Sequence, residues 1–540
     1  MPSSGYDYVI VGAGSAGCVL ASRLSEDAAV RVLLIEAGGR DWHPYIHIPL
    51  GLGRMHDRRM FDWGYETDPE PNLNNRRIEA MRGKVLGGSS SINVMAYTRG
   101  NPGDYDRWAQ KGARGWSFAD VLPYFRRCET WREGEDNWRG GTGPLGTEFA
   151  RTQDPIYEAW LDAATACGYP LTPDYNGKQQ EGFGRGQYSI RDGRRSSSAK
   201  AFLKPASGRK NLTVVTNAHT TRVLLNGTHA TGVEYIQAGS ALRASASREV
   251  ILAAGAFNTP QILMLSGIGP ARHLRDFGIG AVADLPVGKN LQDHLGAYMT
   301  YTRKQPGSFH REMRFDRMTA SMIRAYLFGQ GPATVVPGGL HAFIKTRPEL
   351  AVPDIEFMFR GTSHAPRLWF PFIRPPYHDG YGIRPTLLHP DSRGELLLGS
   401  ADPLAPPRIV YRFFTAPSDL PTLREGFKRA RELAFHKALD AYRGEEIGPG
   451  LKVKSDDEID NWLKNTVITA HHPAGTCAMG PDGVLDSNLK VHGIESLRVC
   501  DASAMPDLVS AHINACVLMM AEKAADLIRG REASPQAEAA

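Results

Sequence analysis

The sequence has little cysteine, and its cysteines form no pattern typical of a cross-linked or metal-stabilised fold. Only six occur among 540 residues, at positions 18, 128, 167, 477, 500 and 516, with no CxxC pair and no His/Cys cluster at ligand spacing. This scatter argues against a disulfide framework and a structural zinc site. We therefore expect no metal ion and a reducing compartment.

Long apolar runs and runs of like charge are also missing. No window approaches the roughly 18 apolar residues of a membrane-spanning helix, and the first strand-like run starts at Tyr6, too near Met1 for a signal peptide. We expect a cytoplasmic protein and leave peripheral membrane contact open. The 63 Lys and Arg against 58 Asp and Glu leave a net charge of +5 without a basic patch, so no nucleic-acid partner is expected.

The composition that remains is typical of a folded globular chain. Hydrophobic residues make up 42% and charged residues 22% of the sequence, which argues against disorder and against a coiled coil. The length allows about three domain equivalents, or fewer large domains with insertions.

The first 40 residues predict one βαβ unit with a nucleotide-binding turn. The strand-like run Tyr6 to Val11 leads directly into GAGSAG, residues 12–17, and a second strand, 30–35, ends at Glu36. In such a unit Gly12 makes the turn, Gly14 lets the backbone approach a pyrophosphate and Gly17 lets helix and strand pack closely. Glu36 lies at the distance expected for an acid that binds a ribose hydroxyl, so the motif indicates a dinucleotide but does not distinguish NAD from FAD.

Further segments suit close contact with a flat ligand. They are the glycine- and serine-rich run 82–100, the strand, turn and Pro260-led helix of 248–270, the run 285–294, and 498–505, where a short strand ends at Asp501 before a helix of about 514–528. The run 82–100 is too apolar for a solvated loop, which favours a buried cofactor-contacting loop.

Together these segments resemble the glucose-methanol-choline oxidoreductase family of flavoproteins. The runs GKVLGGSSSIN, GAFNTPQILMLSGIG, VGKNLQDH and HHPAGTCAMG to DASAMP occur in the family's order between Tyr6 and about Arg529, and the bacterial alcohol, sorbose and choline dehydrogenases are the most similar branch. The resemblance implies FAD. It also implies an α/β fold, with a Rossmann-like FAD-binding domain and an inserted substrate domain built on an antiparallel sheet.

The resemblance also implies the residues that contact FAD. The pyrophosphate is expected over the glycine turn, the adenine near the backbone of Val223, and the flavin beside Gly88, Asn93, Ala96 and Asn514. Some relatives bind FAD covalently through a histidine at the place of Ile92, so non-covalent FAD is expected here. The full set of expected cofactor residues is Gly12, Gly14, Ser15, Ala16, Gly17, Glu36, Ala37, Arg82, Val85, Gly87, Gly88, Asn93, Val94, Met95, Ala96, Val223, Ala254, Gly255, Asp501, Ala502, His512 and Asn514.

Two histidines are the candidate catalytic residues. Oxidation of an alcohol needs a base for the hydroxyl proton, and neutral imidazole suits this role near neutral pH. Consecutive side chains on an extended stretch point opposite ways, so one of His471 and His472 is expected to face the flavin. The family motif selects His472. His512 is expected to orient the substrate oxygen, although dehydrogenases of the resembling branch usually carry asparagine there.

The predicted FAD-binding domain comprises 1–155, 206–298 and 461–534, and the predicted substrate domain comprises 156–205 and 299–460. The segment 363–381, rich in proline and aromatic residues, is a candidate substrate-access lid. The tail 535–540 is expected to be disordered.

The leading hypothesis is FAD-dependent oxidation of a small alcohol to an aldehyde or ketone, with hydride transfer to flavin N5. Electrons would pass to oxygen or to another acceptor such as a quinone, a cytochrome or a dye. A flavin-containing lyase of the hydroxynitrile-lyase type and a non-enzymatic flavin-binding protein are the alternatives on the same fold. The identity of the alcohol and the oligomeric state stay open.

Overall fold

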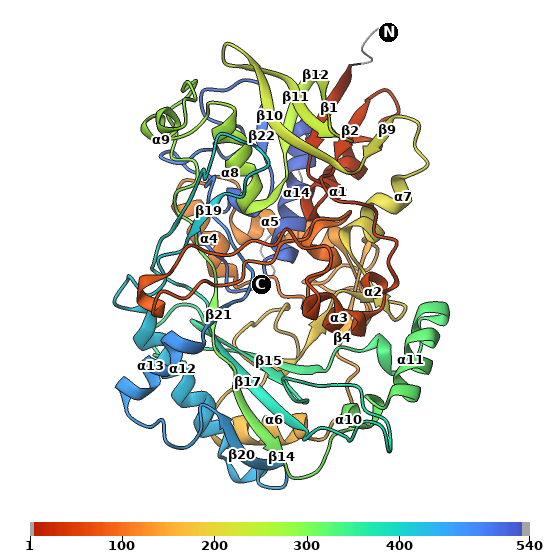
Figure 1. Ribbon diagram of the computed structural model, residues 1–540, viewed down its shortest axis with the longest axis vertical. Helices are drawn as coiled ribbons and strands as arrows, with labels where there is room; N and C mark the ends of the chain where they lie inside the picture. Colours follow the sequence, from red (N-terminus) through yellow and green to blue (C-terminus); the bar gives the residue numbers. More distant parts are fainter. Residues whose placement is uncertain (1–4, 532–540) are drawn as a thin grey trace.

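A computed structural model describes residues 5–531, and its chain forms two large β-sheets, each with its own helices (Figure 1). One sheet lies in the upper half of that view, and the other lies in the lower half. The expected disordered tail 535–540 falls outside the described residues. The α/β class expected from the sequence is confirmed.

The seven-stranded sheet has a parallel part and an antiparallel part. β9 (Leu212–Val215), β2 (Val32–Ile35), β1 (Tyr6–Val11), β12 (Ser240–Leu252) and β22 (Leu497–Val499) run parallel. β10 (Ala218–Asn226) and β11 (His229–Gln237) extend it as an antiparallel meander from the first half of β12. The end of β1 (Val9–Val11) and all of β2 are apolar and buried, because both faces of a parallel sheet are covered by other elements.

Helices α1 (Ser15–Leu24) and α14 (Asn514–Arg529) pack together beside this sheet, although almost the whole chain separates them (Figure 1). The Ser15 hydroxyl donates to Asn514 Oδ1 at 2.7 Å and joins their first residues. At Gly17 a Cβ would lie 1.9 Å from the Gly12 carbonyl oxygen, so only glycine allows α1 to approach the turn.

Helix α8 differs from its expected form. It spans Gly255–Leu265, so Pro260 lies inside the helix and does not begin it. Proline lacks the N–H that would bond to the carbonyl four residues earlier. Here that carbonyl, of Ala256, accepts a hydrogen bond from the Thr476 hydroxyl at 2.7 Å, which explains why the helix continues past the proline.

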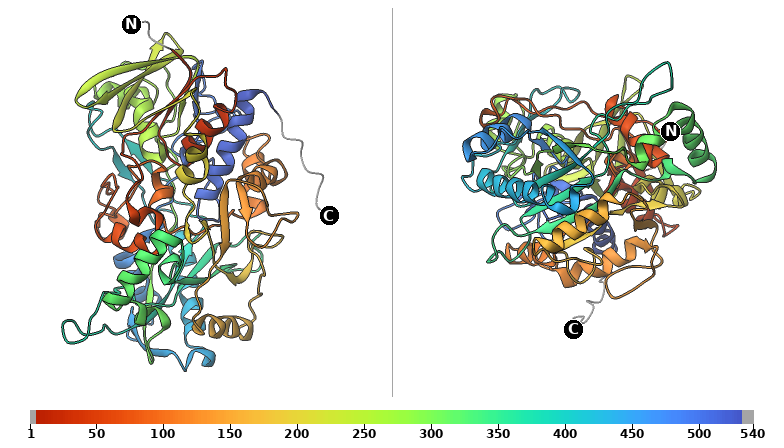
Figure 2. Two further views of the ribbon diagram at one scale, coloured as in Figure 1. Left: turned by 90° about the vertical axis from the view of Figure 1, so that its right-hand side faces the viewer. Right: turned by 90° about the horizontal axis from the view of Figure 1, so that it is seen from below.

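The second sheet has eight strands, and all its pairings are antiparallel, as expected. It contains β5 (Gly182–Arg185), β13 (Leu295–Gly296), β14 (Met299–Arg303), β15 (Gly338–Ile344), β16 (Ile355–Arg360), β17 (Gly380–Leu387), β20 (Arg443–Gly448) and β21 (Ile468–Thr469). Helix α12 (Asp419–Ala434) packs on β16 and β17, and α6 (Ile156–Ala166) packs on α12. The sheet therefore has a helical layer of its own (Figure 2).

The expected division of the chain into two domains stays a prediction. Two short strands, β13 and β21, join the eight-stranded sheet from segments assigned to the FAD-binding domain. They pair with each other, so the chain around 291–296 and 468–474 connects the two regions.

Smaller elements complete the described fold. They are α2 (Pro44–His47), α3 (Leu52–Asp57), α4 (Pro102–Gln110), α5 (Phe118–Cys128), α7 (Lys204–Ala206), α9 (Ala271–Asp276), α10 (Ser308–Glu312), α11 (Phe315–Phe328), α13 (Asp456–Thr466), β3 (Glu129–Trp131), β4 (Leu145–Phe149), β6 (Gln187–Tyr188), β7 (Ile190–Arg191), β8 (Arg194–Arg195), β18 (Glu395–Leu397) and β19 (Arg408–Val410). None of the helices within residues 5–531 combines the length and apolar character that crossing a bilayer demands.

Candidate active site

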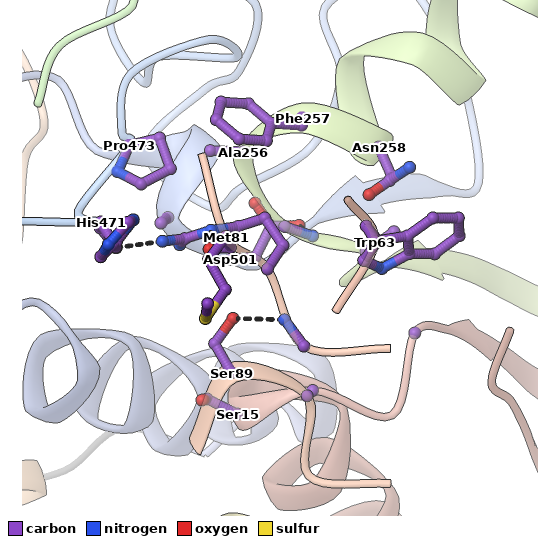
Figure 3. Close-up of a pocket in the computed structure, with 18 of the residues that line it drawn as sticks. Ser15, Trp63, Met81, Ser89, Ala256, Phe257, Asn258, His471, Pro473 and Asp501 are labelled. Atoms are coloured by element: carbon purple, nitrogen blue, oxygen red, sulfur yellow. Dashed lines mark hydrogen bonds between the residues drawn. The ribbon is translucent and has the colours of Figure 1, made fainter. Parts of the chain in front are cut away.

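A cavity of about 370 Å³ extends from the glycine turn of the seven-stranded sheet to the edge of the antiparallel sheet. Figure 3 shows lining residues that converge from distant segments, with Ser15 below, Trp63 and Asn258 on one side and His471 and Pro473 on the other. Most of the site residues expected from the sequence line it: Gly12, Gly14, Ser15, Ala16, Glu36, Ala37, Arg82, Gly88, Asn93, Val94, Met95, Ala96, Ala254, Gly255, His472, Asp501, Ala502, His512 and Asn514.

Four of the expected residues do not line the cavity. Gly17 is packed against Gly12 and Gly87 against Ser91, and Val85 is fully buried. The backbone N–H of Val223 donates to the Ser266 hydroxyl at 2.8 Å. Residues 218–220, at the start of the same strand β10, border the cavity instead, because only the beginning of this strand reaches the cavity.

The nucleotide end of the cavity is built from closely approaching backbone. A Cβ on Gly12 would lie 2.5 Å from the Ala253 carbonyl oxygen, and one on Gly88 would lie 2.7 Å from the Gly14 Cα. Gly14 precedes α1 without a side-chain cap, and the first turn of α1 holds no acidic residue. The first N–H groups of α1 are thus left for an external anion, which fits the pyrophosphate of FAD.

Glu36 closes the same end of the cavity. Its carboxylate accepts 2.8 Å hydrogen bonds from the backbone N–H groups of Ala13 and Gly38, which fix it at the end of β2. Burial raises the pKa of Glu36 to about 7 despite these two hydrogen bonds. A carboxyl group that is both fixed and poorly solvated fits a ribose hydroxyl, which would add a donor to it.

The loop 82–100 is held by a buried arginine that the sequence did not single out. Arg195 Nη1 donates to the Asn93 carbonyl and to Asn93 Oδ1, each at 2.7 Å, and to the Ser90 carbonyl at 3.2 Å. Its Nε donates to the Ile46 carbonyl at 2.8 Å. Arg195 therefore fixes the loop and the orientation of the Asn93 side chain, which lines the cavity.

Asp501 is committed to the protein itself. Its carboxylate accepts from the Gly255 N–H at 2.8 Å, the Thr259 hydroxyl at 2.6 Å, and the Ser503 N–H and hydroxyl at 2.8 and 2.6 Å. These contacts join the first turn of α8 to the segment after β22. Asp501 thus borders the cavity while its carboxylate positions backbone around it.

His472 lies at the junction of the two sheets and is paired with a second histidine. Its Nδ1 is 2.9 Å from His294 Nδ1, and its backbone N–H donates to Asp293 Oδ1 at 2.9 Å. The Tyr411 hydroxyl donates to the other oxygen of Asp293 at 2.7 Å. Burial, with the neighbouring His512 and His294 rings, holds the pKa of His472 well below its ordinary value. His472 is therefore neutral at physiological pH.

His512 faces His472 across the cavity and is held from behind by a carboxylate. The two rings lie 4.9 Å apart and nearly perpendicular. His512 Nε2 lies 3.0 Å from Glu356 Oε1 on β16, and His341 Nδ1 on β15 lies 3.4 Å from the same oxygen. Burial would raise the pKa of Glu356, but these two imidazoles outweigh burial and hold the pKa well below its usual range.

The same three side chains, His341, Glu356 and His512, could geometrically hold a metal ion, because their ligand atoms lie within 4.8 Å of one another. The sequence did not indicate this cluster. The contact of His512 Nε2 with Glu356 is a hydrogen bond, whereas His341 Nδ1 lies within ion-pair distance of the same oxygen without a hydrogen-bond partner among the described residues. The contact between His512 and Glu356 needs no metal ion.

The substrate end also contains residues that the motifs did not predict. Tyr298, Met358, Arg384 and Ile468 line it, and both His471 and His472 border the cavity. His471 has a left-handed backbone with φ 61°, so the two residues do not alternate as on an extended strand, and which of them faces the flavin stays a prediction. Burial, together with the positive charges of Arg82 and Arg384, lowers the pKa of His471 to about 3, so His471 is uncharged.

The comparisons with known proteins agree with this site. Two family models described as GMC oxidoreductase match residues 6–296 and 390–521. An oxygen-dependent choline dehydrogenase of Ectopseudomonas mendocina is 42% identical over 99% of this chain and 96% of its own, and one from Paraburkholderia phymatum is 43% identical over 98% and 94%.

Solved structures show the same architecture. Pyridoxine 4-oxidase from Mesorbium loti has a TM-score of 0.87 and 32% identity over 98% of this chain and 100% of its own. A formate oxidase from Aspergillus oryzae has a TM-score of 0.89 and 30% identity over 98% and 99%.

Proposed function

The chain belongs to the GMC oxidoreductase family, an FAD-dependent family, and from this premise we propose that it oxidises a small alcohol with His472 as the base. The observation that carries the assignment is the contact between His472 Nδ1 and His294 Nδ1 at 2.9 Å. It occupies one ring nitrogen of His472 and leaves Nε2 for a ligand in the cavity. His472 is neutral and buried, as a proton acceptor requires.

The contact between the two Nδ1 atoms also constrains the protons. Two facing ring nitrogens hydrogen-bond only when one carries a proton and the other does not. For His472 to accept the hydroxyl proton at Nε2, its Nδ1 must carry hydrogen and donate to His294. His294 must then be protonated at Nε2. Burial lowers the pKa of His294 to about 3, so it stays neutral and able to accept at Nδ1.

His512 takes the complementary role of orienting the substrate oxygen. Its Nε2 is engaged by Glu356, so Nδ1 is the ring nitrogen that remains for the substrate hydroxyl. Glu356 engages Nε2 and so fixes the orientation of the His512 ring beside His472.

The cofactor site can be assigned in the same terms. Bound FAD would supply the acceptor for the hydride from the carbinol carbon. The first turn of α1, Glu36 and residues 218–220 would hold its nucleotide part, and the loop 88–96 with Asn514 would hold the flavin. Ile92 offers no nucleophilic atom for a covalent bond. We therefore propose non-covalent FAD, which denaturation with acid would release in full.

The test is anaerobic reduction of the yellow protein by a panel of primary and secondary alcohols. Bleaching of the flavin absorption with formation of the aldehyde or ketone is expected. A flavin that stays oxidised while cyanohydrins are cleaved would favour the lyase instead, and inertness toward every substrate would favour a non-enzymatic binding protein. The paired histidines at one cavity make the last alternative the weakest.

The acceptor is proposed to be oxygen. Relatives named oxygen-dependent dehydrogenases and oxidases support this choice. Admission of air after anaerobic reduction should restore the yellow colour within a turnover time and release hydrogen peroxide. Persistent bleaching that only a quinone, a cytochrome or a dye reverses would overturn it.

A further inference from the structure

Arg384, at the substrate end of the cavity, is a buried cation that forms no ion pair with a carboxylate of residues 5–531. It lies on β17 opposite Met358 of β16, lines the cavity and is 6% exposed. Nη2 donates to the Ile468 carbonyl at 3.1 Å, and the guanidinium lies 5.2 Å from the centre of the Tyr298 ring. Its Nε is buried and makes no hydrogen bond within the described residues.

The other buried arginines of residues 5–531 are better satisfied. Arg99 and Arg139 pair with Glu129, Arg498 pairs with Glu249, and Arg195 binds four backbone or amide oxygens. Arg384 has one carbonyl and one aromatic ring. A buried charge is costly unless it is paired, so an unpaired arginine at a cavity wall indicates a partner that arrives with the ligand.

The backbone nearby leaves room for this side chain. A Cβ on Gly296 would lie 3.0 Å from Arg384 Nε and 2.5 Å from the Pro385 carbonyl oxygen. A side chain at 296 would therefore compete with the guanidinium for the same space. The strand pair β13–β17 is built so that Arg384 can occupy the cavity wall.

The charges around the cavity have a clear polarity. Its acidic lining residues, Glu36 and Asp501, lie at the nucleotide end. The cationic lining residues are Arg82 and Arg384, His471 is neutral, and the ionised Glu356 lies behind His512 in contact with two imidazoles. Asp293 stands behind the wall and is committed to the His472 N–H and the Tyr411 hydroxyl. A cationic substrate would meet like charge in a poorly solvated space.

We propose that Arg384 binds a carboxylate of the substrate, so that the preferred substrate is an alcohol that also carries a carboxylate. A quaternary ammonium alcohol such as choline is disfavoured, despite the names of the curated relatives. The planar guanidinium suits a carboxylate because two N–H groups can donate to its two oxygens. This inference rests on the proposed alcohol oxidation and names its substrate class.

The experiment compares alcohols of one frame that differ in charge. Benzyl alcohol, 3- and 4-(hydroxymethyl)benzoate and 4-(hydroxymethyl)-N,N,N-trimethylanilinium are each used to reduce the holoenzyme anaerobically. We expect kcat/KM to be about 10- to 100-fold higher for one carboxylate isomer than for benzyl alcohol, the effect of a charge-assisted hydrogen bond. The ammonium compound should be the poorest substrate.

Variants at Arg384 sharpen the comparison. In Arg384→Met the ratio of kcat/KM for the carboxylate to that for benzyl alcohol should fall about 10- to 100-fold, mainly through KM, and Arg384→Lys should recover part of it. Arg185→Met is the matched control, because Arg185 lies on β5 of the same sheet outside the cavity lining. It should leave the ratio within about twofold.

Preference of the wild type for the ammonium compound, or an unchanged ratio in Arg384→Met, would overturn the inference. A failure of alcohol oxidation is distinguishable, because benzoate binding can be measured separately from the perturbation of the flavin spectrum. If no alcohol bleaches the flavin, weaker benzoate binding in Arg384→Met still supports a carboxylate site. Equal benzoate affinity in the two proteins refutes it.

Discussion

At its nucleotide end the cavity is shaped by backbone, whereas at its substrate end it is shaped by side chains from separate segments. A methyl group on Gly12 would collide with the Ala253 carbonyl oxygen, and one on Gly88 would collide with the backbone of Gly14. His472, His512 and Arg384 instead come from the β21 region, the start of α14 and β17. The nucleotide end suits a cofactor that a whole family shares, whereas substitutions of side chains at the substrate end can change the substrate specificity.

The largest effect is expected from His472→Ala. Loss of the base should slow flavin reduction by about 10²- to 10⁴-fold while FAD stays bound, since His472 belongs to the substrate end. Stopped-flow absorbance under anaerobic conditions measures this. His492→Ala removes a histidine outside the cavity lining and is the control. A reductive half-reaction within a few-fold of wild type would show that another group is the base.

Glu356→Gln tests the support of His512. The substitution keeps the shape but removes the charge 3.0 Å from Nε2, and the reduction rate should fall about 10- to 100-fold, as is typical for a residue that orients a catalytic imidazole. The pH dependence of the rate should change as well. Glu446→Gln removes a buried carboxyl group elsewhere in the sheet, where it pairs with Arg431, and should not change this pH profile.

Gly12→Ala tests the nucleotide end. A methyl group 2.5 Å from the Ala253 carbonyl oxygen, at φ +95°, forces the turn apart, so FAD affinity should fall about tenfold or more. The ratio of flavin to protein absorbance after dialysis reports it. Gly168→Ala has a comparable φ of +82° with nothing within 4 Å. It controls for backbone strain alone and should retain FAD.

His294→Gln separates the pH dependence of stability from catalysis. Folding lowers the pKa of His294 from 6.5 to about 3, so between these values the unfolded state binds one more proton than the folded state. The free energy of unfolding therefore decreases as the pH decreases. Glutamine has no such titration. Relative to the variant, wild type should lose about 1.4 kcal/mol per pH unit from about pH 6 downward. Parallel stability curves in denaturant titrations would contradict the buried neutral state.

The smallest effect is expected from removal of metal ions. If His341, Glu356 and His512 interact without a metal ion between them, dialysis against a chelator should leave flavin reduction unchanged within error. Metal analysis of the dialysed protein is the accompanying measurement. A loss of rate that one divalent ion restores would mean that these three side chains form a metal site.

The same contrast between the two ends explains what the sequence could predict. The glycine turn, Glu36 and the buried loop 82–100 are local features whose spacing carries their geometry, and the structure places them at one cavity. Glu356 lies in β16 among mostly apolar residues. A charged residue in such a strand could have indicated a functional role for Glu356, but no sequence motif includes it.

The contacts at the substrate end could not be read in this way. His294 and His472 are 178 residues apart, and Glu356 and His512 are 156 apart, so no local spacing relates them. Arg384 lacks a motif altogether. The start of α8 was misplaced because a proline usually begins a helix, and only the distant Thr476 hydroxyl allows this one to lie inside.

The short strands β13 and β21 bear on how the two halves of the molecule can move. Asp293, His294 and His472 all lie on or beside this antiparallel pair, so they would travel together as one unit if the sheets rocked against each other. The bond from His512 to Glu356, by contrast, spans from the start of α14 to the opposite sheet. A shift of one sheet against the other would therefore change the distance between His512 and Glu356 while leaving the contact between His294 and His472 unchanged.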